Sequence, residues 1–281
     1  MQSKTLAGKV ILLTGASAGI GAATARQLAA AGAHLVLAAR RLPRLRRLAV
    51  EITGQGGQIL VVKTDFSDYK QIGRLVRRSL ATFGHIDVLI NIAGWGSYSW
   101  IDTSKPAHLD KQFAVNVLAP LHLIRLIVPH MQRRRSGHII NMVSYASRVA
   151  VPPQTLYAGT KYALEGLTDG LRRELQPWGI HVSRVHPGGV SGTEFNELAA
   201  RRGGVGFQSP GVGNLSRETV ARALHRLILR PRRELMLGRL YDIPAFINRY
   251  APWLVDWAMG WWVRRKRKLD DGDTMTYEDP E

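Results

Sequence analysis

Tyr157 and Lys161 stand four residues apart in the stretch LYAGTKYALEG, residues 156–166. The stretch favours a helix, so both side chains are expected on one helix face. A phenol beside an ammonium suits proton transfer, because a nearby positive charge favours the phenolate. The pair alone is a weak signal, since ordinary packing also produces such pairs, and the rest of the chain has to support it.

Short apolar runs alternate with stretches of helical period from the start of the chain. The runs predict strands at 9–15, 33–40, 57–64, 85–94, 137–144 and 180–188, with a further strand at 234–238. Helices are predicted at about 19–31, 43–53, 68–83, 106–133, 155–177 and 216–229. Continuous apolar strands indicate a sheet covered on both faces. The alternation therefore predicts a Rossmann-like, doubly wound parallel α/β sheet of six to seven strands.

The first strand leads into TGASAGIG, residues 14–21, which opens the first helix. Glycine allows a tight turn at Gly15, close approach of a pyrophosphate at Gly19, and close helix–strand packing at Gly21. The free N–H groups of the helix start also favour phosphate binding. We therefore predict a dinucleotide site, contacted in this turn by Gly15, Ser17, Gly19, Ile20 and Gly21.

The end of the second strand bears on the choice between NADP and NAD. An acidic residue there would hold the ribose 2′-hydroxyl of NAD, but the chain has Ala39, Arg40 and Arg41. A guanidinium binds a 2′-phosphate through paired donors, so Arg40 and Arg41 favour NADP. The alternative is that both arginines are solvated. Asp65 is expected either to accept a hydrogen bond from an adenine amino group or to cap the helix near Asp68.

Polar residues gather where strands four and five end, at the sheet edge where ligands bind in open α/β folds. NIAG, residues 91–94, ends strand four, and Ser144 ends strand five. Asn116 lies in the long helix between them, and Tyr157 and Lys161 lie in the helix that follows. We expect these side chains to converge on the edge that carries the glycine turn.

Together, TGASAGIG, NIAG, Asn116, Ser144 and YAGTK resemble, in order and spacing, the motif set of the short-chain dehydrogenase/reductase family, over about residues 6–240. The resemblance implies an NADP-dependent oxidoreductase that transfers a hydride between the nicotinamide and a carbonyl or secondary alcohol. It implies Tyr157 as the acid/base, Ser144 as the group that polarises the carbonyl, and Asn116 as the holder of a proton-relay water. Lys161 would contact Tyr157 and the nicotinamide ribose.

The family pattern also implies contacts with the cofactor beyond the glycine turn. These are Asn91, Ala93, Gly94, Tyr157, Lys161, Pro187, Gly188 and Thr193. Thr193 would meet either the carboxamide or the phosphates. Two positions depart from the pattern: Ile92 replaces a frequent asparagine, and Thr193 falls one residue later than usual.

The resemblance gives the Tyr157–Lys161 pair a chemical purpose. A tyrosine titrates near pH 10, about 4 kcal/mol from easy proton exchange at neutrality. A lysine charge about 5 Å away contributes roughly 3 kcal/mol at an effective dielectric constant of about 20. We therefore expect Lys161 to lower the pKa of Tyr157. Ser147 competes with Ser144 for the role beside the substrate carbonyl.

Residues 1–240 are expected to form one dinucleotide-binding and catalytic domain. The glycine-rich stretch 189–215 is long for a connection, and we interpret it as a lid rather than an unstructured insertion. The substrate cleft is expected to be apolar, suiting a lipid-like molecule, with a lining of Trp95, Tyr98, Trp100, Val149, Val151 and the 189–215 stretch.

The tail, residues 241–281, is expected to be helical, with a basic cluster, RRKRK at 264–268, and an acidic end. An aromatic stripe at helical spacing comprises Phe246, Tyr250, Trp253, Trp257 and Trp261. Tryptophans flanked by basic residues suit a membrane interface, so residues 241–268 are expected to contact a membrane or a second subunit, or else to cover the cleft. The apolar span is too short to cross a bilayer.

Composition bounds the remaining possibilities. The chain has no cysteine and its nine histidines show no metal-ligand spacing, so no metal site is predicted. The net charge of +18 would suit a polyanion, but no nucleic-acid-binding motif accompanies it. We expect a cytoplasmic homo-oligomer, with membrane association as an option, acting on a small carbonyl or alcohol. The alternative function is a non-enzymatic dinucleotide-sensing or membrane-docked binding protein.

Overall fold

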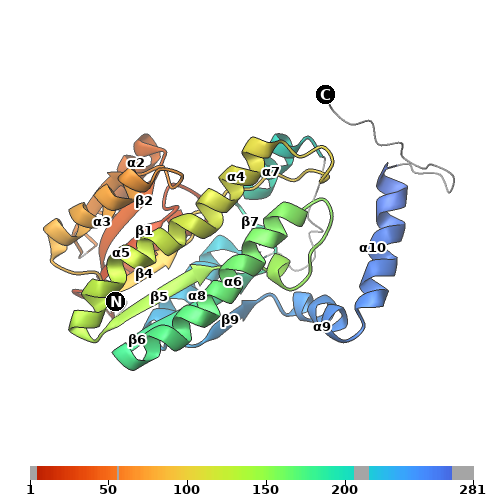
Figure 1. Cartoon of the computed structure of the whole chain (residues 1–281). Helices are drawn as coiled ribbons and strands as arrows, with labels where there is room; N and C mark the ends of the chain where they lie inside the picture. Colours follow the sequence, from red (N-terminus) through yellow and green to blue (C-terminus); the bar gives the residue numbers. More distant parts are fainter. Residues whose placement is uncertain (1–4, 56, 206–214, 268–281) are drawn as a thin grey trace.

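The structure of the 281-residue chain is a computed structural model that describes residues 5–55, 57–205 and 215–267. Its centre is a parallel sheet of seven strands in the order β3-β2-β1-β4-β5-β6-β9 (Figure 1). The strand order reverses between β1 and β4, and such a switch point opens a crevice at the carboxyl ends of the strands. The predicted α/β fold is confirmed. The strands are β1 (Val10–Thr14), β2 (His34–Ala39), β3 (Ile59–Lys63), β4 (Val88–Asn91), β5 (Gly137–Met142), β6 (Ile180–Pro187) and β9 (Glu234–Leu237).

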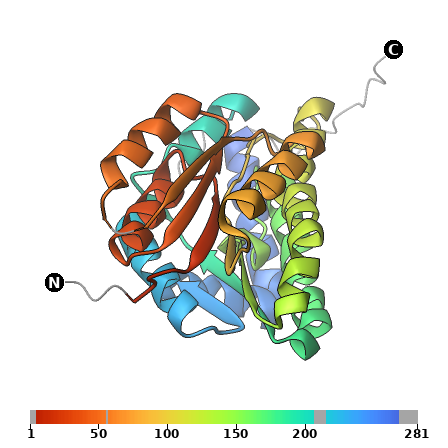
Figure 2. The same ribbon diagram turned by 90° about the vertical axis from the view of Figure 1, so that its left-hand side faces the viewer.

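Two helical layers cover the two faces of the sheet (Figure 2). One layer holds α1 (Gly19–Ala30), α2 (Leu42–Ile52) and α8 (Arg217–Leu229), and the other holds α3 (Tyr69–Phe83), α5 (Ala119–Arg134) and α6 (Thr155–Leu175). Neighbouring strand residues point to opposite layers: Leu13 joins the first core and Leu12 the second. This explains why the strands are continuous apolar runs. Short helices lie at η2 (Tyr145–Ser147), η3 (Gln176–Trp178) and η4 (Arg239–Tyr241).

The long helix predicted at 106–133 contains a change of winding. It consists of α4 (Pro106–Phe113), a π-helical turn η1 (Ala114–Leu118) and α5. Among the described residues, one helix, Pro106–Arg134, is long and apolar enough to span a membrane, and 44% of its apolar window is buried inside the protein. That burial is typical of a core helix that packs on a sheet.

The glycine-rich stretch after β6 carries short elements of its own. They are β7 (Val190–Ser191), α7 (Phe195–Gly203) and β8 (Leu215–Ser216), with β7 and β8 paired in parallel. Residues 206–214, the C-terminal part of the predicted lid, lie outside the described residues. The part that is described therefore contains a helix where the sequence suggested a loop.

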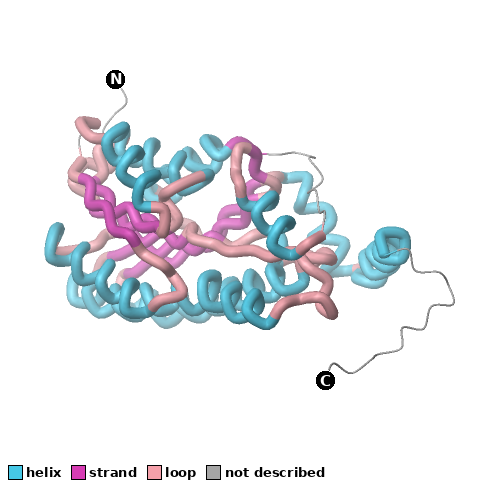
Figure 3. The backbone as a smooth tube through the Cα atoms, turned by 90° about the horizontal axis from the view of Figure 1, so that it is seen from above, coloured by secondary structure: helices cyan, strands magenta, loops and turns pink. Residues whose placement is uncertain are grey.

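The tail forms two helices, α9 (Asp242–Tyr250) and α10 (Pro252–Arg267), where a single aromatic stripe was expected. Ala251 has φ −140° and ψ 58°, outside the helical region, and the following proline disfavours helix at that position. The predicted stripe is consequently split between two helices. Figures 1 and 3 place α10 at one end of the molecule, outside both helical layers. Lys268 and the acidic end lie beyond the described residues.

Candidate active site

Tyr157 and Lys161 occupy consecutive turns of α6 and are both nearly buried, at 9% and 4% exposure. The Lys161 Nζ donates a hydrogen bond of 2.9 Å to the carbonyl oxygen of Met142, the last residue of β5. The same nitrogen lies 5.6 Å from the centroid of the Tyr157 ring. The ammonium is thus fixed between the end of a strand and the phenol, as the spacing in the sequence predicted.

Burial moves the pKa values of both groups. It raises the pKa of Tyr157 to about 12, against the effect of a hydrogen bond with Ser144. It lowers the pKa of Lys161 to about 8. The expectation that Lys161 brings the pKa of Tyr157 below its usual value is therefore wrong for the protein alone. The cause is the aromatic cover over the phenol, which removes water that would solvate a phenolate.

Ser144 follows β5 and caps η2, where its Oγ accepts a hydrogen bond of 3.1 Å from the Ala146 N–H. It is half-buried and reaches the Tyr157 hydroxyl. Ser147, the competing candidate, is 2% exposed and donates to the Ser144 carbonyl oxygen at 2.7 Å. The structure therefore places Ser144 beside Tyr157 and uses Ser147 to hold the η2 turn.

Asn116 lies in the π-helical turn and is 1% exposed. Its Oδ1 accepts from the Trp95 N–H at 2.8 Å and its Nδ2 donates to the Trp95 carbonyl oxygen at 2.9 Å. The Nδ2 also lies 3.1 Å from the Thr160 Oγ1, which in turn donates to the Tyr157 carbonyl oxygen at 2.8 Å. Asn116 therefore ties the segment after β4 to the helix that carries Tyr157.

Aromatic side chains cover Tyr157 from two directions. The Phe195 ring of α7 lies 5.3 Å from the Tyr157 ring, and the Tyr98 ring lies 6.1 Å from it. The Tyr98 hydroxyl donates to Asn196 Oδ1 at 2.9 Å, so the two covers are joined. The described part of the 189–215 stretch thus lies over the site, in the place expected for a lid.

The predicted cleft lining is only partly correct. Tyr98 faces Tyr157, but Trp95 is 6% exposed and belongs to the core against α3 and α5. The Trp95 ring packs edge-on to His108 at 5.2 Å and under the Arg202 guanidinium at 5.1 Å. Hydrogen bonds to Asn116 hold the Trp95 backbone, and the ring packs into the core cluster, a long-range contact that the sequence could not show.

The glycine turn fits the phosphates of a dinucleotide. Gly15 has φ 70°, and a Cβ there would lie 2.9 Å from the Ala93 N, while a Cβ at Gly21 would lie 2.2 Å from the Gly15 oxygen. At the start of α1 no side chain caps the N–H groups, and the first turn carries no acidic residue. An anion is the natural partner for such a helix start. Thr193 lies across the turn, with its methyl 3.2 Å from where a Gly19 Cβ would be.

Both arginines after β2 are exposed beside this turn. The Arg41 Nε lies 3.4 Å from the Ser17 Oγ, and its Nη1 forms a 2.8 Å ion pair with Glu194 of the lid. Arg44, which was not among the predicted contacts, pairs with the same carboxylate at 2.8 Å. Hydrogen bonds from Arg41 and Arg44 lower the pKa of Glu194. Glu194 thus occupies the guanidinium that was predicted to bind the 2′-phosphate. Because Glu194 is more than 150 residues from Arg41 in the sequence, no local pattern predicts this ion pair.

The remaining predicted contacts lie along the same edge. Asp65 accepts from the Ser67 N–H at 3.0 Å, whereas Asp68 caps α3, so the capping alternative for Asp65 is wrong. Asn91 Nδ2 donates to Asn141 Oδ1, and its own Oδ1 is buried without a hydrogen-bond partner among the described residues. Thr14 Oγ1 accepts from the N–H groups of Ile92 and Ala93. Three further candidates lie at strand ends. Gly94 comes shortly after β4, Pro187 is the last residue of β6, and Gly188 follows it.

A network of ion pairs lies directly behind the Ser144 loop. His186 is fully buried, with its Nδ1 3.3 Å from the Ser144 carbonyl oxygen and its Nε2 2.9 Å from Glu234 Oε1. Glu165, His186 and Glu234 offer atoms within 4.8 Å of one another, which would suit a cation. However, Arg148 and Arg184 pair with both carboxylates, and two guanidiniums would repel a metal. We interpret the cluster as a support for the Ser144 turn.

Removal of one charge tests this interpretation. Glu234→Ala removes the carboxylate that pairs with Arg148, His186 and the buried Arg184, whose side chain is 6% exposed, and leaves Glu165 to pair with both guanidiniums. Breaking a buried pair costs about 3–5 kcal/mol, and the 27% exposure of Glu234 reduces this to about 2 kcal/mol. Urea unfolding measures the loss. Glu197→Ala, which removes an exposed pair with Arg201, is the control and should change stability by less than about 0.5 kcal/mol. Equal effects would contradict the interpretation.

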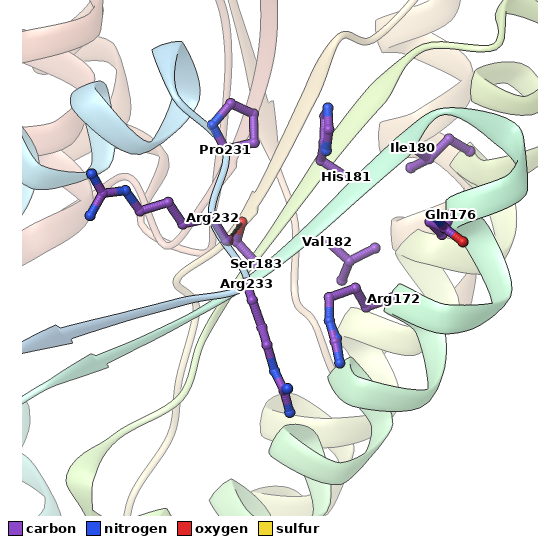
Figure 4. A pocket seen from close by; sticks show the side chains of 9 residues that line it. All are labelled: Arg172, Gln176, Ile180, His181, Val182, Ser183, Pro231, Arg232 and Arg233. Carbon is purple, nitrogen blue, oxygen red and sulfur yellow. Dashed lines mark hydrogen bonds between the residues drawn. The ribbon is translucent and has the colours of Figure 1, made fainter.

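A separate cavity of about 200 Å³ lies at the other end of β6 (Figure 4). Residues 180–183 at the start of the strand line it, with Arg172 of α6 and the segment 231–233 before β9. Ser144 and Tyr157 lie at the carboxyl end of the sheet, so this cavity is not part of their site. Arg233 and Arg172 there both pair with Asp169, at 3.2 and 3.4 Å.

Comparisons with known proteins give the family. The short chain dehydrogenase family model matches residues 9–202. An uncharacterized oxidoreductase of Staphylococcus saprophyticus is 38% identical over 191 residues, covering 67% of this chain and 76% of that protein. A metagenomic short-chain oxidoreductase in complex with NADP has a TM-score of 0.72 at 32% identity, covering 83% of this chain and 97% of the other.

A further solved structure supports the fold alone. A short chain dehydrogenase/reductase of Burkholderia phymatum in complex with NAD has a TM-score of 0.80 at 24% identity, covering 97% of this chain and 99% of the other. The strand order of the sheet, the glycine turn before α1 and the family match agree with one another. The chain belongs to the short-chain dehydrogenase family and is an oxidoreductase that uses a nicotinamide dinucleotide.

Proposed function

We propose that the chain uses NADP to interconvert a carbonyl compound and its secondary alcohol, with an apolar or lipid-like substrate. The observation that supports this most is the buried Lys161 ammonium, fixed 5.6 Å from the Tyr157 ring, while the Tyr157 hydroxyl contacts Ser144. The proposal includes assembly into a homo-oligomer and contact of residues 241–268 with a membrane surface.

In this proposal each residue has one task in the reduction. Hydride transfer to the carbonyl carbon is the chemistry that a bound nicotinamide would supply. The Ser144 hydroxyl donates a hydrogen bond to the carbonyl oxygen, and the Tyr157 hydroxyl gives that oxygen its proton. With a pKa of about 12, Tyr157 is protonated at neutral pH and ready to act as the acid. The Lys161 charge stabilises the phenolate that remains.

Asn116 has a positioning task in this proposal. Both polar atoms of its amide are engaged with the Trp95 backbone, and its Nδ2 lies near Thr160. These contacts fix the position of the helical turn that carries Tyr157 relative to the segment that follows β4. The proton-relay water implied by the family resemblance would then have to bind to backbone groups of the π-helical turn.

The residues at the end of β2 fit NADP. Arg40 and Arg41 stand where an NAD enzyme would carry a carboxylate, and Arg44 adds a third guanidinium beside them. A 2′-phosphate would be bound by Arg41 after displacing Glu194, because that carboxylate occupies the same guanidinium. NADP binding and the position of the lid are therefore linked.

The competition for Arg41 can be measured. Arg41→Glu should raise the Kd for NADPH at least about tenfold, the loss of one charged hydrogen bond, with little change for NADH. Glu194→Gln should lower the Kd for NADPH severalfold, because the competing charge is gone. Arg47→Glu, an equal charge change on the exposed face of α2, is the control in fluorescence titrations. If the ratio of the Kd for NADPH to the Kd for NADH were the same in Arg41→Glu as in the wild type, Arg41 would not bind the 2′-phosphate.

NADPH oxidation with a panel of aldehydes and ketones of increasing chain length tests the function itself. Tyr98 and Phe195 surround Tyr157, so KM should fall as the apolar part of the substrate grows. NADPH binding without turnover of any member would favour the non-enzymatic binding protein instead.

A further inference from the structure

The helices α9 and α10 each expose large apolar side chains to solvent. We call those that are 59–73% exposed the aromatic face: Ile243, Phe246, Tyr250, Trp253, Trp257 and Trp261. Monomeric proteins seldom expose so many large apolar side chains together unless another surface covers them. We propose that the aromatic face docks the protein on an anionic lipid bilayer and places the mouth of the substrate site at the membrane surface.

The two sides of α10 have different surroundings. Trp253, Trp257 and Trp261 are one turn apart and 59–73% exposed, whereas Met259 and Trp262 are half-buried toward the body of the protein. The helix is therefore already attached by one side and carries its tryptophans on the other. A helix of this kind, lying in the interface plane, inserts its rings at the level of the lipid headgroups.

Charge indicates which surface covers the aromatic face. Within residues 242–267 there are five basic and two acidic residues, and the whole chain has a net charge of +18. The Arg265 guanidinium lies 5.6 Å from the Trp261 ring centroid, and that of Arg249 lies 5.8 Å from the Tyr250 ring centroid. Positive groups beside interfacial aromatic rings are attracted to anionic headgroups. A second copy would bring the same positive charges together, so we favour lipid over self-association.

A chain of contacts joins α10 to the candidate active site. The Trp262 ring lies 6.3 Å from the Trp100 ring, and the Arg267 guanidinium lies 5.1 Å from the same ring and 2.6 Å from Asp102 Oδ2. Two residues before Trp100, the Tyr98 ring packs against Tyr157. Docking through the exposed tryptophans would thus hold the segment 98–102 behind α10, one helix diameter, roughly 10 Å, from the lipid. This step rests on the proposed function, because it predicts that an apolar carbonyl substrate enters from the bilayer.

Sedimentation of the full chain with vesicles tests the docking. Vesicles of phosphatidylcholine with phosphatidylglycerol should bind the protein, and vesicles of phosphatidylcholine alone should bind it weakly. Added salt should weaken the binding. Trp257→Ala should reduce the partition coefficient about tenfold, and Arg265→Gln with Lys266→Gln about fivefold per charge. Absence of binding to the anionic vesicles, or equal binding to both vesicle types, would overturn the proposal.

Matched variants elsewhere on the protein control for general charge and hydrophobicity. Trp178→Ala removes a 39% exposed tryptophan of η3, and Arg77→Gln with Arg78→Gln removes two exposed charges of α3. Both should leave vesicle binding unchanged. Sedimentation velocity without lipid tests whether a second copy of the chain covers the aromatic face instead. If Trp257→Ala dissociates an oligomer and vesicle binding is absent, the face is an interface between copies and the proposal is wrong.

The link to substrate entry has its own readout. NADPH oxidation with a water-soluble ketone should be equal in the wild type and Trp257→Ala, whereas the rate with a long-chain ketone embedded in anionic vesicles should fall about tenfold in the variant, in proportion to the lost binding. Equal rates with the embedded ketone would contradict entry from the bilayer. Failure of the proposed redox reaction would instead abolish turnover of the soluble ketone and leave vesicle sedimentation unaffected.

Discussion

Tyr157→Phe should lower kcat for ketone reduction about a thousandfold, within the 10²–10⁴-fold contribution typical of a positioned general acid. The phenol is the buried hydroxyl that contacts Ser144, next to the Lys161 ammonium. Removal of one oxygen leaves the ring packed against Phe195 and Tyr98. The Kd for NADPH should therefore change little, and steady-state kinetics with fluorescence titration separates the two effects.

Tyr98→Phe is the matched control for this change. The Tyr98 ring lies beside Tyr157, and its hydroxyl bonds to Asn196 of the lid. Loss of that hydrogen bond is worth about 1 kcal/mol, which corresponds to about a fivefold effect on kcat/KM. If Tyr157→Phe were no slower than Tyr98→Phe, the proton would have to come from another group.

The second large effect is expected for Lys161→Met. A positive charge 5.6 Å from the phenol ring contributes about 3 kcal/mol at an effective dielectric constant of about 20, so kcat should fall roughly 150-fold. In the wild type, reduction should slow as the pH rises through about 8, where Lys161 loses its proton. Lys161→Met should lack this decline. The pH dependence of kcat, measured for the wild type and the variant, tests both expectations.

Stability provides the control for Lys161→Met. The pKa of Lys161 is lower in the folded protein, about 8, than its usual 10.5. The folded state therefore binds the proton less tightly than the unfolded state, and wild-type stability should rise as the pH increases from about 8 to 10.5. The variant should be at least as stable as the wild type near neutral pH and should not show this rise. A decline in its kcat above pH 8 would mean that another group titrates.

The sequence was sufficient for the elements that position the site. The strands must be continuous apolar runs because neighbouring residues, such as Leu12 and Leu13, pack into the cores on opposite faces of the sheet. The glycine turn is recognisable because it needs residues without a Cβ. Such signals are local. The predicted strands and helices consequently lie within a few residues of those in the structure.

Features that depend on contacts between distant segments escaped prediction. Glu194 meets Arg41 only after α7 folds back over the glycine turn, and Trp95 packs into the core cluster between the sheet and its helices. The raised pKa of Tyr157 comes from the cover supplied by the lid. Each depends on packing in three dimensions, which periodicity along the chain does not encode.

The tail contains one feature that the sequence predicted correctly and one that was predicted wrongly. Its aromatic residues were correctly recognised as unusual, but Pro252 divides them between α9 and α10. Trp262, which falls off the predicted stripe, is the ring that contacts Trp100. A proline inside an apparently periodic pattern is itself a local signal for a helix boundary, so this division was available from the sequence.

Single-turnover reduction of a hydrophobic ketone by NADPH carrying deuterium at both C4 positions of the nicotinamide tests the central claim most directly. Mass spectrometry of the product should find a single deuterium on the carbinol carbon with the wild-type protein, and product formation about a thousandfold slower with Tyr157→Phe. An alcohol without deuterium, or equal rates for the two proteins, would contradict hydride transfer assisted by Tyr157.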